Sequence, residues 1–471
     1  MVPAWKGSFC LAWQRRGFEP RPARSGFYGK RNRTNRIPSG RMFMNSFMPT
    51  FVTVDQLADH QLKGLRWTVS HAYQGSAAYR AKFDAAGVKP EDIRCLDDLK
   101  RLPFTTAADM AAGYPFPLLC VPFEDVVRIH ASSGTTGKRK VLCYTKKDVS
   151  DWAHFFARCY EMAELSRQDR VQICVGYGVW TAGVGFQLGC EQFGALAVPA
   201  GPGNLEMQME FLIDFQSTVI CCTASMGLLL AEEVERRGLR DKIRLKKMIY
   251  GSERSSDAMR ERIRNLLGLT HMFDIPGMTE LYGPGTGLEC TAHRGMHYWA
   301  DYYLVEILDP ETLEPVPEGE VGEMVVTTLC KEAVPLIRYR TRDLTALIPE
   351  PCSCGNMLPR HDRILGRSDD MFIVRAVNVY PGQIDTALSG IPGIGSEYQV
   401  LLERKDGKDI MRLRVERELA ADPSADRHTE ALVKETIKKK ILVTPQVEIV
   451  EYGSLPRSER KTKRVFDMRE A

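Results

Sequence analysis

Short runs of β-branched residues alternate with amphipathic stretches from about residue 125 onward, and this alternation limits the fold more than any other feature. The predicted strands cover 126–131, 170–177, 195–200, 217–224 and 246–251. Apolar residues recur at helical spacing in 151–165, 207–215, 227–238 and 257–268. Strands and helices that alternate in this way build a layered α/β fold.

The regions on either side of this stretch have other patterns. A helical pattern runs through 51–95, whereas 302–348 is rich in strands without helices between them. After the polar run 367–370 come strands at 398–404 and 411–417 and a helix at 427–442. We therefore predict a large α/β domain of several subdomains, residues 44–368, and a small α+β domain, residues 369–471.

Residues 1–43 are predicted to stand apart from the fold. They carry ten Lys or Arg residues and one acid, so the rest of the chain has a net charge of −5 within a total of +4. Such a mildly acidic body does not indicate a nucleic-acid-binding surface. The chain has no run of eighteen apolar residues, and we predict no membrane span.

The extension 1–43 also lacks the apolar central region of a secretory signal. We interpret it as a disordered tail, or as the product of an upstream start with Met42, Met44 or Met48 nearer the natural one. An organellar transit peptide is the alternative. The thirteen cysteines are odd in number and scattered through apolar runs, which indicates reduced thiols in a cytoplasmic protein.

The loop SSGTTGK, residues 132–138, directly follows the predicted strand 126–131 and has the composition of an anion-binding loop. Glycines bring backbone N–H groups close to an anion, hydroxyls donate hydrogen bonds and a lysine adds charge. The residues concerned are Ser132, Ser133, Gly134, Thr135, Thr136, Gly137 and Lys138. Two residues rather than four separate the glycines, which excludes a Walker loop. A surface turn without a ligand is the alternative.

This loop resembles the phosphate loop of the adenylate-forming superfamily. The segments LPFTT, YPFPLLCVP and VVRIHASSGTTGK resemble, more narrowly, the phenylacetate-CoA ligase family, and the resemblance runs from about residue 60 to the end. It implies a large AMP-binding domain followed by a small mobile lid domain. It also implies that Ser132 to Lys138 hold the β- and γ-phosphates of ATP.

The segment DIPGMTELYGPG, residues 274–285, resembles the second core motif of the family. The resemblance places Asp274 at the nucleotide and makes Thr279 and Glu280 catalytic. A carboxylate such as Glu280 suits Mg²⁺, which prefers hard oxygen ligands. Pro276 stands where relatives have an aromatic residue beside adenine. A solvated acid in a Gly/Pro turn is the alternative.

The resemblance assigns further nucleotide contacts to residues 249–256. It places Gly251, Ser252 and Glu253 beside adenine and the acyl pocket. The alternative is an ordinary strand-to-helix turn capped by Ser255 or Ser256.

Two later segments resemble the ribose motif and the hinge of the family. Asp343, in 338–345, would accept hydrogen bonds from ribose hydroxyls, and Arg367 would contact ribose or phosphate. Asp369 would be the pivot between the domains, with Ala376 where relatives have glycine. A buried Arg–Asp network without a ligand is the alternative.

The segment 454–467 resembles the one that carries the catalytic lysine of the family, and Lys461 is the match. That lysine would bridge the substrate carboxylate and the α-phosphate. Arg460 replaces the usual glycine. A solvated basic C-terminus is the alternative interpretation.

The segment GYGVWTAGVG, residues 176–185, resembles the acyl pocket of relatives. Tyr177 and Trp180 are the candidate substrate contacts, and they indicate an aromatic carboxylic acid. Aromatic residues at this spacing are also common in protein cores.

A second metal site is indicated by Cys290, His297, Cys352 and Cys354. Four soft ligands in two clusters suit tetrahedral structural zinc, and some members of the resembled family carry them in the same places. His293 is the competing histidine, and free surface thiols are the alternative.

We therefore predict an ATP- and Mg²⁺-dependent aryl-acid CoA ligase that forms an acyl-AMP, releases pyrophosphate and then makes the coenzyme A thioester. The expected partners are ATP, CoA and a small aromatic acid, with no nucleic acid and no membrane; a homodimer is compatible with the sequence. One alternative is an adenylating enzyme that loads a carrier-protein thiol or another acceptor. The other is a degenerate nucleotide-binding member without turnover, which Pro276, Ala376 and Arg460 would explain.

Overall fold

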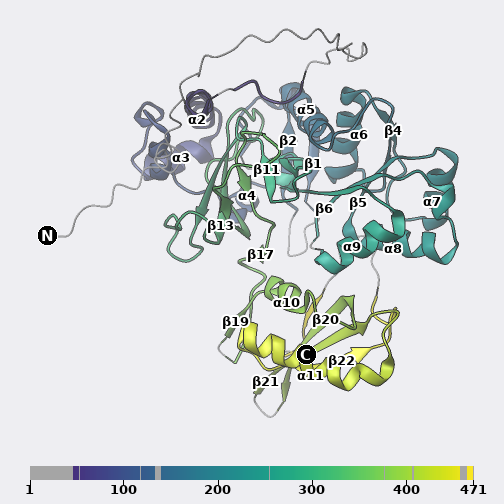
Figure 1. Cartoon of the computed structure of the whole chain (residues 1–471). Helices are drawn as coiled ribbons and strands as arrows, with labels where there is room; N and C mark the ends of the chain where they lie inside the picture. Colours follow the sequence, from purple (N-terminus) through teal and green to yellow (C-terminus); the bar gives the residue numbers. More distant parts are fainter. Residues whose placement is uncertain are drawn as a thin grey trace, which may run out of the picture.

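The computed structural model describes residues 46–51, 53–116, 118–132, 139–253, 255–375, 377–405, 408–456 and 464–469. They form a large N-terminal domain and a small C-terminal domain (Figure 1). The extension 1–43 lies outside these residues. Within them, no helix combines the length and the apolar character that a membrane crossing needs, and every described cysteine is free.

A parallel sheet with the strand order β4-β3-β5-β6-β7 forms the centre of the large domain. Its strands are β3 (Arg170–Ile173), β4 (Leu196–Val198), β5 (Val219–Cys222), β6 (Lys247–Gly251) and β7 (His271–Ile275). The helices that alternate with them are α5 (Lys146–Met162), α6 (Ala182–Phe193), α7 (Leu205–Asp214), α8 (Ala224–Arg236) and α9 (Asp257–Leu267). The predicted α/β layering is confirmed.

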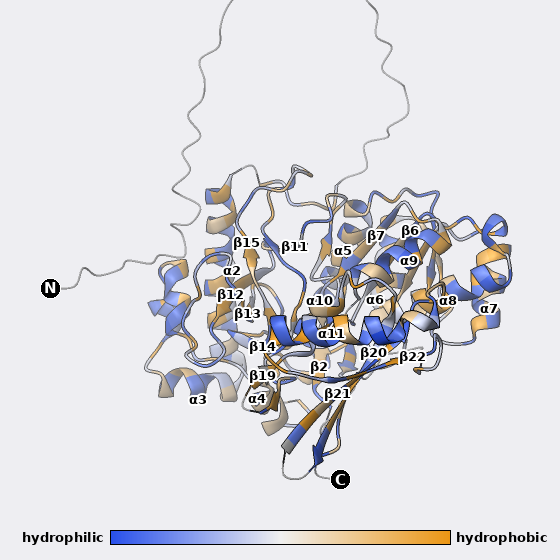
Figure 2. Ribbon diagram, turned by 60° about the horizontal axis from the view of Figure 1, so that its bottom comes forward, coloured by the Kyte–Doolittle hydropathy of each residue, from blue (hydrophilic) through white to orange (hydrophobic). Residues whose placement is uncertain are grey.

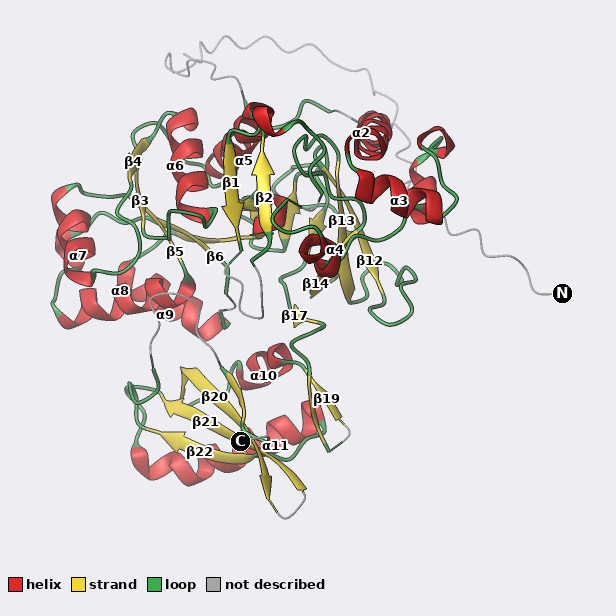
Figure 3. Cartoon of the chain, turned by 180° about the vertical axis from the view of Figure 1, so that it is seen from behind, coloured by secondary structure: helices red, strands yellow, loops and turns green. Residues whose placement is uncertain are grey.

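Helices cover both faces of this sheet. In Figures 1 and 3, α5 and α6 lie on one side and α8 and α9 on the other. Val219 and Cys221 of β5 belong to the core beneath α5 and α6, whereas Ile220 and Cys222 belong to the core beneath α8 and α9. A strand buried on both faces is apolar throughout, which explains the continuous VICC run.

Antiparallel sheets build the rest of the large domain. One has the order β12-β13-β14-β17 and the other the order β10-β11-β16-β15. Their strands are β12 (Tyr303–Leu308), β13 (Gly322–Thr328), β14 (Tyr339–Thr345), β17 (Gly366–Arg367), β10 (Gly287–Glu289), β11 (Met296–Tyr298), β16 (Arg360–His361) and β15 (Leu347–Ile348). The predicted strand-rich stretch is present.

Two short hairpins and three N-terminal helices complete the large domain. The hairpins pair β1 (Arg128–Ala131) with β2 (Val141–Tyr144), and β8 (Gly277–Met278) with β9 (Gly283–Pro284). The helices are α2 (Val54–Gly75), α3 (Ala77–Ala85) and α4 (Ala107–Ala112). The loop of each hairpin carries one of the predicted nucleotide motifs.

The small domain has a hydrophobic core of its own. Its sheet has the order β22-β21-β20-β23. The elements are β18 (Phe372–Val374), β19 (Val377–Val379), α10 (Pro381–Leu388), β20 (Ile394–Lys405), β21 (Lys408–Arg417), α11 (Asp426–Ile441), β22 (Gln446–Val450) and β23 (Val465–Asp467). Helix α11 buries Val433, Ile437 and Ile441, while its hydrophilic side faces outward (Figure 2).

Candidate active site

The ends of the predicted phosphate loop are held together at the open end of the β1–β2 hairpin. The backbone N–H of Ser132 donates to the carbonyl of Lys140 at 3.0 Å, and the N–H of Lys140 donates to Ser132 Oγ at 3.1 Å. Residues 133–138 lie outside the described residues, so their phosphate contacts stay predictions. Pairing of the two strands thus brings Lys140, which the sequence did not single out, to the base of the loop.

Glu280 is the buried carboxylate of the site. It lies in a short 3₁₀ turn, η5 (Thr279–Leu281), and its Oε1 accepts hydrogen bonds from Lys140 Nζ at 2.6 Å and from Tyr339 Oη at 2.8 Å. Burial alone would raise the pKa of Glu280, but the charge of Lys140 and both hydrogen bonds keep the pKa below its usual value. Glu280 is therefore ionised at neutral pH, as a metal ligand must be.

Lys331 fixes the backbone beside this carboxylate. Its Nζ donates to the carbonyl of Glu280 at 2.8 Å and lies 5.0 and 4.6 Å from the ring centres of Tyr144 and Tyr282. Burial lowers the pKa of Lys331 to about 8, while Asp148 and Glu280 oppose that change. Asp148 also accepts hydrogen bonds from the two backbone N–H groups that directly follow Lys331.

The loop around Glu280 is a tight turn that depends on glycine. A Cβ atom on Gly277 would lie 2.2 Å from the carbonyl oxygen of Gly283, and both residues have positive φ angles. The carbonyl of Pro276 accepts the backbone N–H of Gly285 at 3.0 Å. Glycine is therefore required for β8 and β9 to approach each other, and the turn presents Glu280 toward Lys140.

The carboxyl ends of β6 and β7 carry the next group of predicted residues. Gly251 ends β6, and Ser252 follows with a φ of +65°. The carboxylate of Glu253 accepts a 2.8 Å hydrogen bond from Ser225 Oγ in the first turn of α8. Ser256 caps α9, as the alternative interpretation of this segment expected. Contacts of Gly251, Ser252 and Glu253 with a nucleotide stay predictions.

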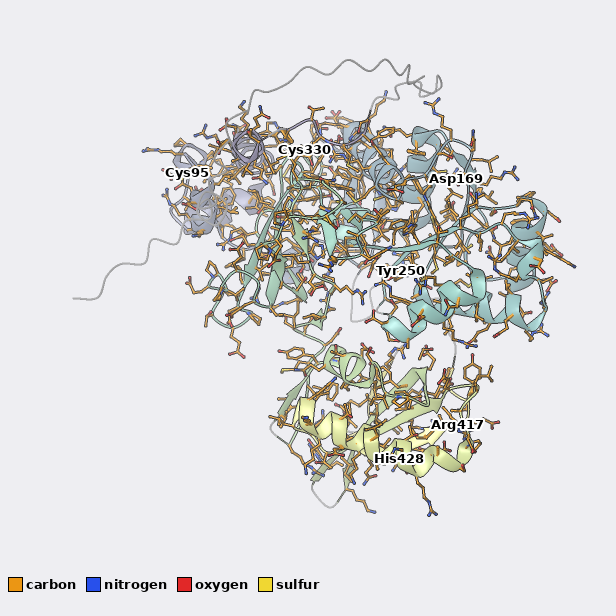
Figure 4. The ribbon with its side chains drawn as sticks, in the orientation of Figure 1. Cys95, Asp169, Tyr250, Cys330, Arg417 and His428 are labelled. Atoms are coloured by element: carbon orange, nitrogen blue, oxygen red, sulfur yellow. The ribbon has the colours of Figure 1, made fainter. Side chains whose placement is uncertain are left out.

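Asp274 occupies the adjacent position on β7 and pairs with Tyr250 of β6. Figure 4 labels Tyr250. Burial, together with the nearby charge of Glu289, raises the pKa of Asp274 to about 7. Arg260 pairs with Glu289 at 2.8 Å and its guanidinium lies 5.4 Å from the centre of the Tyr250 ring. Asp274 therefore changes its charge near neutral pH beside the predicted adenine position.

Asp343 and Arg367 are opposite each other on β14 and β17. Arg367 Nη1 lies 3.4 Å from Asp343 Oδ1, and Arg367 Nε donates to Asp369 Oδ1 at 2.8 Å. Burial disfavours the charge of Arg367, but the two aspartates raise its pKa. The predicted ribose motif and hinge residue therefore form one network at the junction of the domains.

The distant motifs meet in one region of the large domain. Tyr339, which donates to Glu280, lies four residues before Asp343 on β14. A cavity of about 50 Å³ is lined by Gly277 and Met278 from the second motif and by Asp343 from the ribose motif. The cavity thus joins the second motif to the ribose motif, while Lys140 joins Glu280 to the base of the phosphate loop. A shared nucleotide site stays a prediction.

The predicted acyl segment packs its two aromatic rings over its own glycines. A Cβ atom on Gly176 would lie 2.7 Å from the ring of Trp180, and one on Gly183 would lie 2.7 Å from the ring of Tyr177. Both aromatic residues are half-buried. Contact between these rings and a substrate stays a prediction.

Several polar atoms beside this segment are buried without a hydrogen-bond partner among the described residues. They are Tyr177 Oη, Thr181 Oγ1 and His130 Nε2. The other ring nitrogen of His130 lies 3.1 Å from the carbonyl oxygen of Val179, which ties the segment to β1. Buried polar groups usually find a partner in protein, water or a ligand, so these three atoms are available for a bound molecule.

The four predicted zinc ligands come together. One ligand atom of each of Cys290, His297, Cys352 and Cys354 lies within 4.8 Å of the others. The Cys290 and Cys352 sulfurs are 3.5 Å apart, and Cys354 Sγ lies 3.4 Å from His297 Nε2. Two thiolates on one tetrahedral zinc lie about 3.8 Å apart, given Zn–S bonds of about 2.3 Å. The donor types and spacing therefore fit zinc.

Strand pairing selects the histidine of this cluster. His297 lies on β11, which pairs with β10 directly before Cys290, and its Nδ1 lies 2.7 Å from the carbonyl oxygen of Leu358. A proton on Nδ1 leaves Nε2 free as a ligand atom. His293 instead contacts Glu289 and His271, so the competing histidine is not part of the cluster.

Comparison with known proteins identifies the family. The model for "AMP-binding enzyme" matches residues 61–330, and that for "AMP-binding enzyme C-terminal domain" matches residues 376–469. A curated phenylacetate-coenzyme A ligase from Escherichia coli (strain K12) is 41% identical over 423 residues, which cover 88% of this chain and 96% of that protein. The chain belongs to the phenylacetate-CoA ligase family. It is therefore an AMP-forming ligase, as predicted.

Solved structures of a related CoA ligase record two states of that enzyme. A 2-hydroxyisobutyryl-CoA ligase in its postadenylation state, with 2-HIB-AMP, has a TM-score of 0.82 to this chain at 27% identity and covers 89% of this chain. The same enzyme in the thioesterification state, with 2-HIB-AMP and CoA, has a TM-score of 0.65 over the same share. In both comparisons the match covers 91% of the chain of the 2-hydroxyisobutyryl-CoA ligase.

In this member of the phenylacetate-CoA ligase family, the predicted catalytic residue Lys461 lies outside the described residues. Arg460 and Ala376 also lie outside the described residues. Conversely, Lys140, Lys331 and Tyr339 contact Glu280 and were not predicted. Lys331 had one weak signal in the sequence, since it lies with Glu332 in the mainly apolar run LCKEAVPL, where a buried charged residue needs a partner.

Proposed function

We propose that this protein is an ATP-dependent aryl-acid CoA ligase whose acid is phenylacetate or a close analogue. It activates the carboxylate as an acyl-AMP, with release of pyrophosphate, and then transfers the acyl group to the thiol of coenzyme A. The proposal is supported by 41% identity to a phenylacetate-coenzyme A ligase over nearly the whole length of that protein.

One structural observation carries the chemistry. Glu280 is buried and ionised, it is fixed by Lys140, Tyr339 and Lys331, and it lies beside the base of the phosphate loop. Its neighbours Gly277 and Met278 share a cavity with Asp343. When a carboxylate attacks an α-phosphate, two anions meet, so the reaction needs fixed positive charge and exact positioning more than a protein nucleophile. This region of the large domain supplies such an environment.

The main predicted residues have distinct roles in this scheme. The loop Ser132 to Lys138 would hold the β- and γ-phosphates, Asp343 the ribose, and Lys461 the reacting carboxylate and α-phosphate. The carboxylate oxygens of Glu280 fit Mg²⁺, because they are hard and ionised. When bound there, Mg²⁺ would supply positive charge next to the phosphates.

Carboxylate-dependent ATP–pyrophosphate exchange tests this function. We expect exchange with phenylacetate and with some other arylacetates, and none without an acid. Absence of exchange across a panel of aryl acids would instead support a nucleotide-binding protein without turnover. Aliphatic acids of similar length serve as controls, because Tyr177 and Trp180 are proposed to select a ring.

We further propose that Cys290, His297, Cys352 and Cys354 hold a structural zinc ion. Purified protein should contain about one equivalent of zinc by elemental analysis, and less than about a tenth of an equivalent would contradict the site. Cys354→Ser should lose zinc and lower the melting temperature. Cys95→Ser is the matched control, since Cys95 is an exposed thiol in the N-terminal part of the large domain (Figure 4) and should retain the metal.

We also retain three finer proposals from the sequence. The domains divide near Asp369, so that residues 44–368 bind AMP and residues 369–471 form the lid. The protein is cytoplasmic. A homodimer is compatible with the sequence and is tested by its mass in solution.

A further inference from the structure

Tyr452 of the small domain contacts the large domain through its side chain. It lies two residues after β22, and its hydroxyl donates to Glu232 Oε1 on α8. The same hydroxyl accepts a hydrogen bond from Arg262 Nη2 on α9 at 3.2 Å, and the guanidinium carbon lies 5.5 Å from the centre of the Tyr452 ring. The hydroxyl of Tyr452 is thus held by the carboxylate of Glu232 and the guanidinium of Arg262, which come from two helices of the large domain.

The large-domain side of this contact is itself organised by ion pairs. Arg262 Nε lies 3.5 Å from Glu232 Oε1, and Arg262 Nη2 lies 3.4 Å from Glu235 Oε2. These ion pairs hold Arg262 and Glu232 in place between α8 and α9. Both side chains are therefore already positioned to form hydrogen bonds with the hydroxyl of Tyr452. In the described part of the chain, Tyr452 makes both hydrogen bonds that join the domains beyond the hinge.

Tyr452 also belongs to the segment that leads to Lys461. Three residues later, the backbone N–H of Leu455 donates to the buried carboxylate of Glu416 on β21 at 2.8 Å. The segment 451–456 is therefore fastened to the large domain at Tyr452 and to the small-domain sheet at Leu455. This double attachment fixes the start of the chain that carries Lys461 nine residues beyond Tyr452.

The observed arrangement of the domains resembles one state of a related enzyme more than the other. The TM-score is 0.82 to the postadenylation state of the 2-hydroxyisobutyryl-CoA ligase and 0.65 to its thioesterification state, at equal coverage of this chain. The contact of Tyr452 with α8 and α9 therefore occurs in an arrangement that resembles the postadenylation state, in which the related enzyme holds an acyl-adenylate, more than the thioesterification state.

We propose that Tyr452 is a positioning residue for the adenylation half-reaction. By binding Glu232 and Arg262, it holds the small domain where Lys461 can reach the substrate carboxylate, and it releases when the domain turns for thioester formation. The inference rests on the proposed function. The interaction with Tyr452 would stabilise one arrangement only, so its loss would shift the balance between the two half-reactions rather than lower both.

Tyr452→Phe removes the hydroxyl and keeps the ring. We expect acid-dependent ATP–pyrophosphate exchange to fall about tenfold, which corresponds to the loss of one hydrogen bond to charged groups. Thioester formation from supplied phenylacetyl-adenylate and CoA should be unchanged or faster. Glu232→Gln should shift the ratio of the two rates in the same direction. The double variant should differ little from either single variant, because both substitutions weaken the same Tyr452–Glu232 hydrogen bond.

Tyr73→Phe is the matched control. The hydroxyl of Tyr73 also bonds one acid and one base, Asp84 at 2.9 Å and Lys89 at 2.8 Å, but all three lie on the N-terminal part of the large domain. This variant should leave the ratio of the half-reactions as in the wild type. Melting temperatures of all variants separate a folding defect from an effect on positioning, and Glu232→Gln serves if Tyr452→Phe folds poorly.

An equal fall in both half-reactions, or no change in either, would overturn the role of Tyr452 while leaving the proposed function intact. Failure of the proposed function is seen in the wild type itself, as absence of exchange with every aryl acid. The ratio of the two rates in the variants is therefore the deciding quantity for Tyr452.

Discussion

Replacing Glu280 with glutamine is expected to lower acid-dependent ATP–pyrophosphate exchange by about 10²–10³-fold, the usual cost of one lost electrostatic group at a reacting phosphate or oxyanion. The substitution keeps the shape of the side chain and removes its charge. Lys140 would then face a neutral amide at the base of the phosphate loop. The affinity for Mg²⁺ should fall as well, so a higher Mg²⁺ concentration should restore part of the exchange rate.

Glu311→Gln is the control for this change, since Glu311 is exposed and lies in a surface turn after β12. It should keep wild-type exchange. Circular dichroism and the melting temperature show whether Glu280→Gln is folded. A folded Glu280→Gln variant with exchange within about twofold of the wild type would contradict the assigned role of Glu280.

Lys461→Ala is expected to abolish exchange and to leave thioester formation from supplied acyl-adenylate largely intact. The reason is that the proposed role of Lys461 lies in the first half-reaction only, where a cation offsets the charge that develops between carboxylate and α-phosphate. Rates of both half-reactions, measured on one preparation, check this expectation.

Lys463→Ala makes the same chemical change two residues away in the same basic run. It should retain exchange if Lys461 has a specific role. Equal losses in the two variants would indicate that the basic segment acts only through its general charge, and equal loss of both half-reactions in Lys461→Ala would contradict its assignment to adenylation.

The layers of the fold could be predicted because strand and helix periodicities were strong between 126 and 268. The helix α6 was missed, since its sequence AGVGFQLGCEQF contains three glycines and has low helix propensity. The structure shows why these glycines are there: a Cβ atom on Gly189 would lie 2.1 Å from Cβ of Phe156 on α5. Close packing of two helices overrides local propensity here. Strand β7 and helix α10 were also not predicted.

Residues of the candidate site could be predicted only where they lie within a local sequence motif. Glu280 and Asp343 lie in recognisable segments, whereas Lys140, Tyr339 and Lys331 reach Glu280 from separate strands and loops. Partners that are 51 to 140 positions apart in the chain leave no spacing pattern. The contact of Tyr452 with Glu232, 220 positions away, has the same character.

The most direct test of the central claim is product analysis after incubation of the wild type with phenylacetate, ATP, Mg²⁺ and free coenzyme A. We predict that phenylacetyl-CoA and AMP form in equal amounts, that pyrophosphate accompanies them, and that none forms without the acid. AMP and phenylacetyl-adenylate without any CoA thioester would contradict the assignment to a CoA ligase and would indicate a carrier-protein thiol or another acceptor.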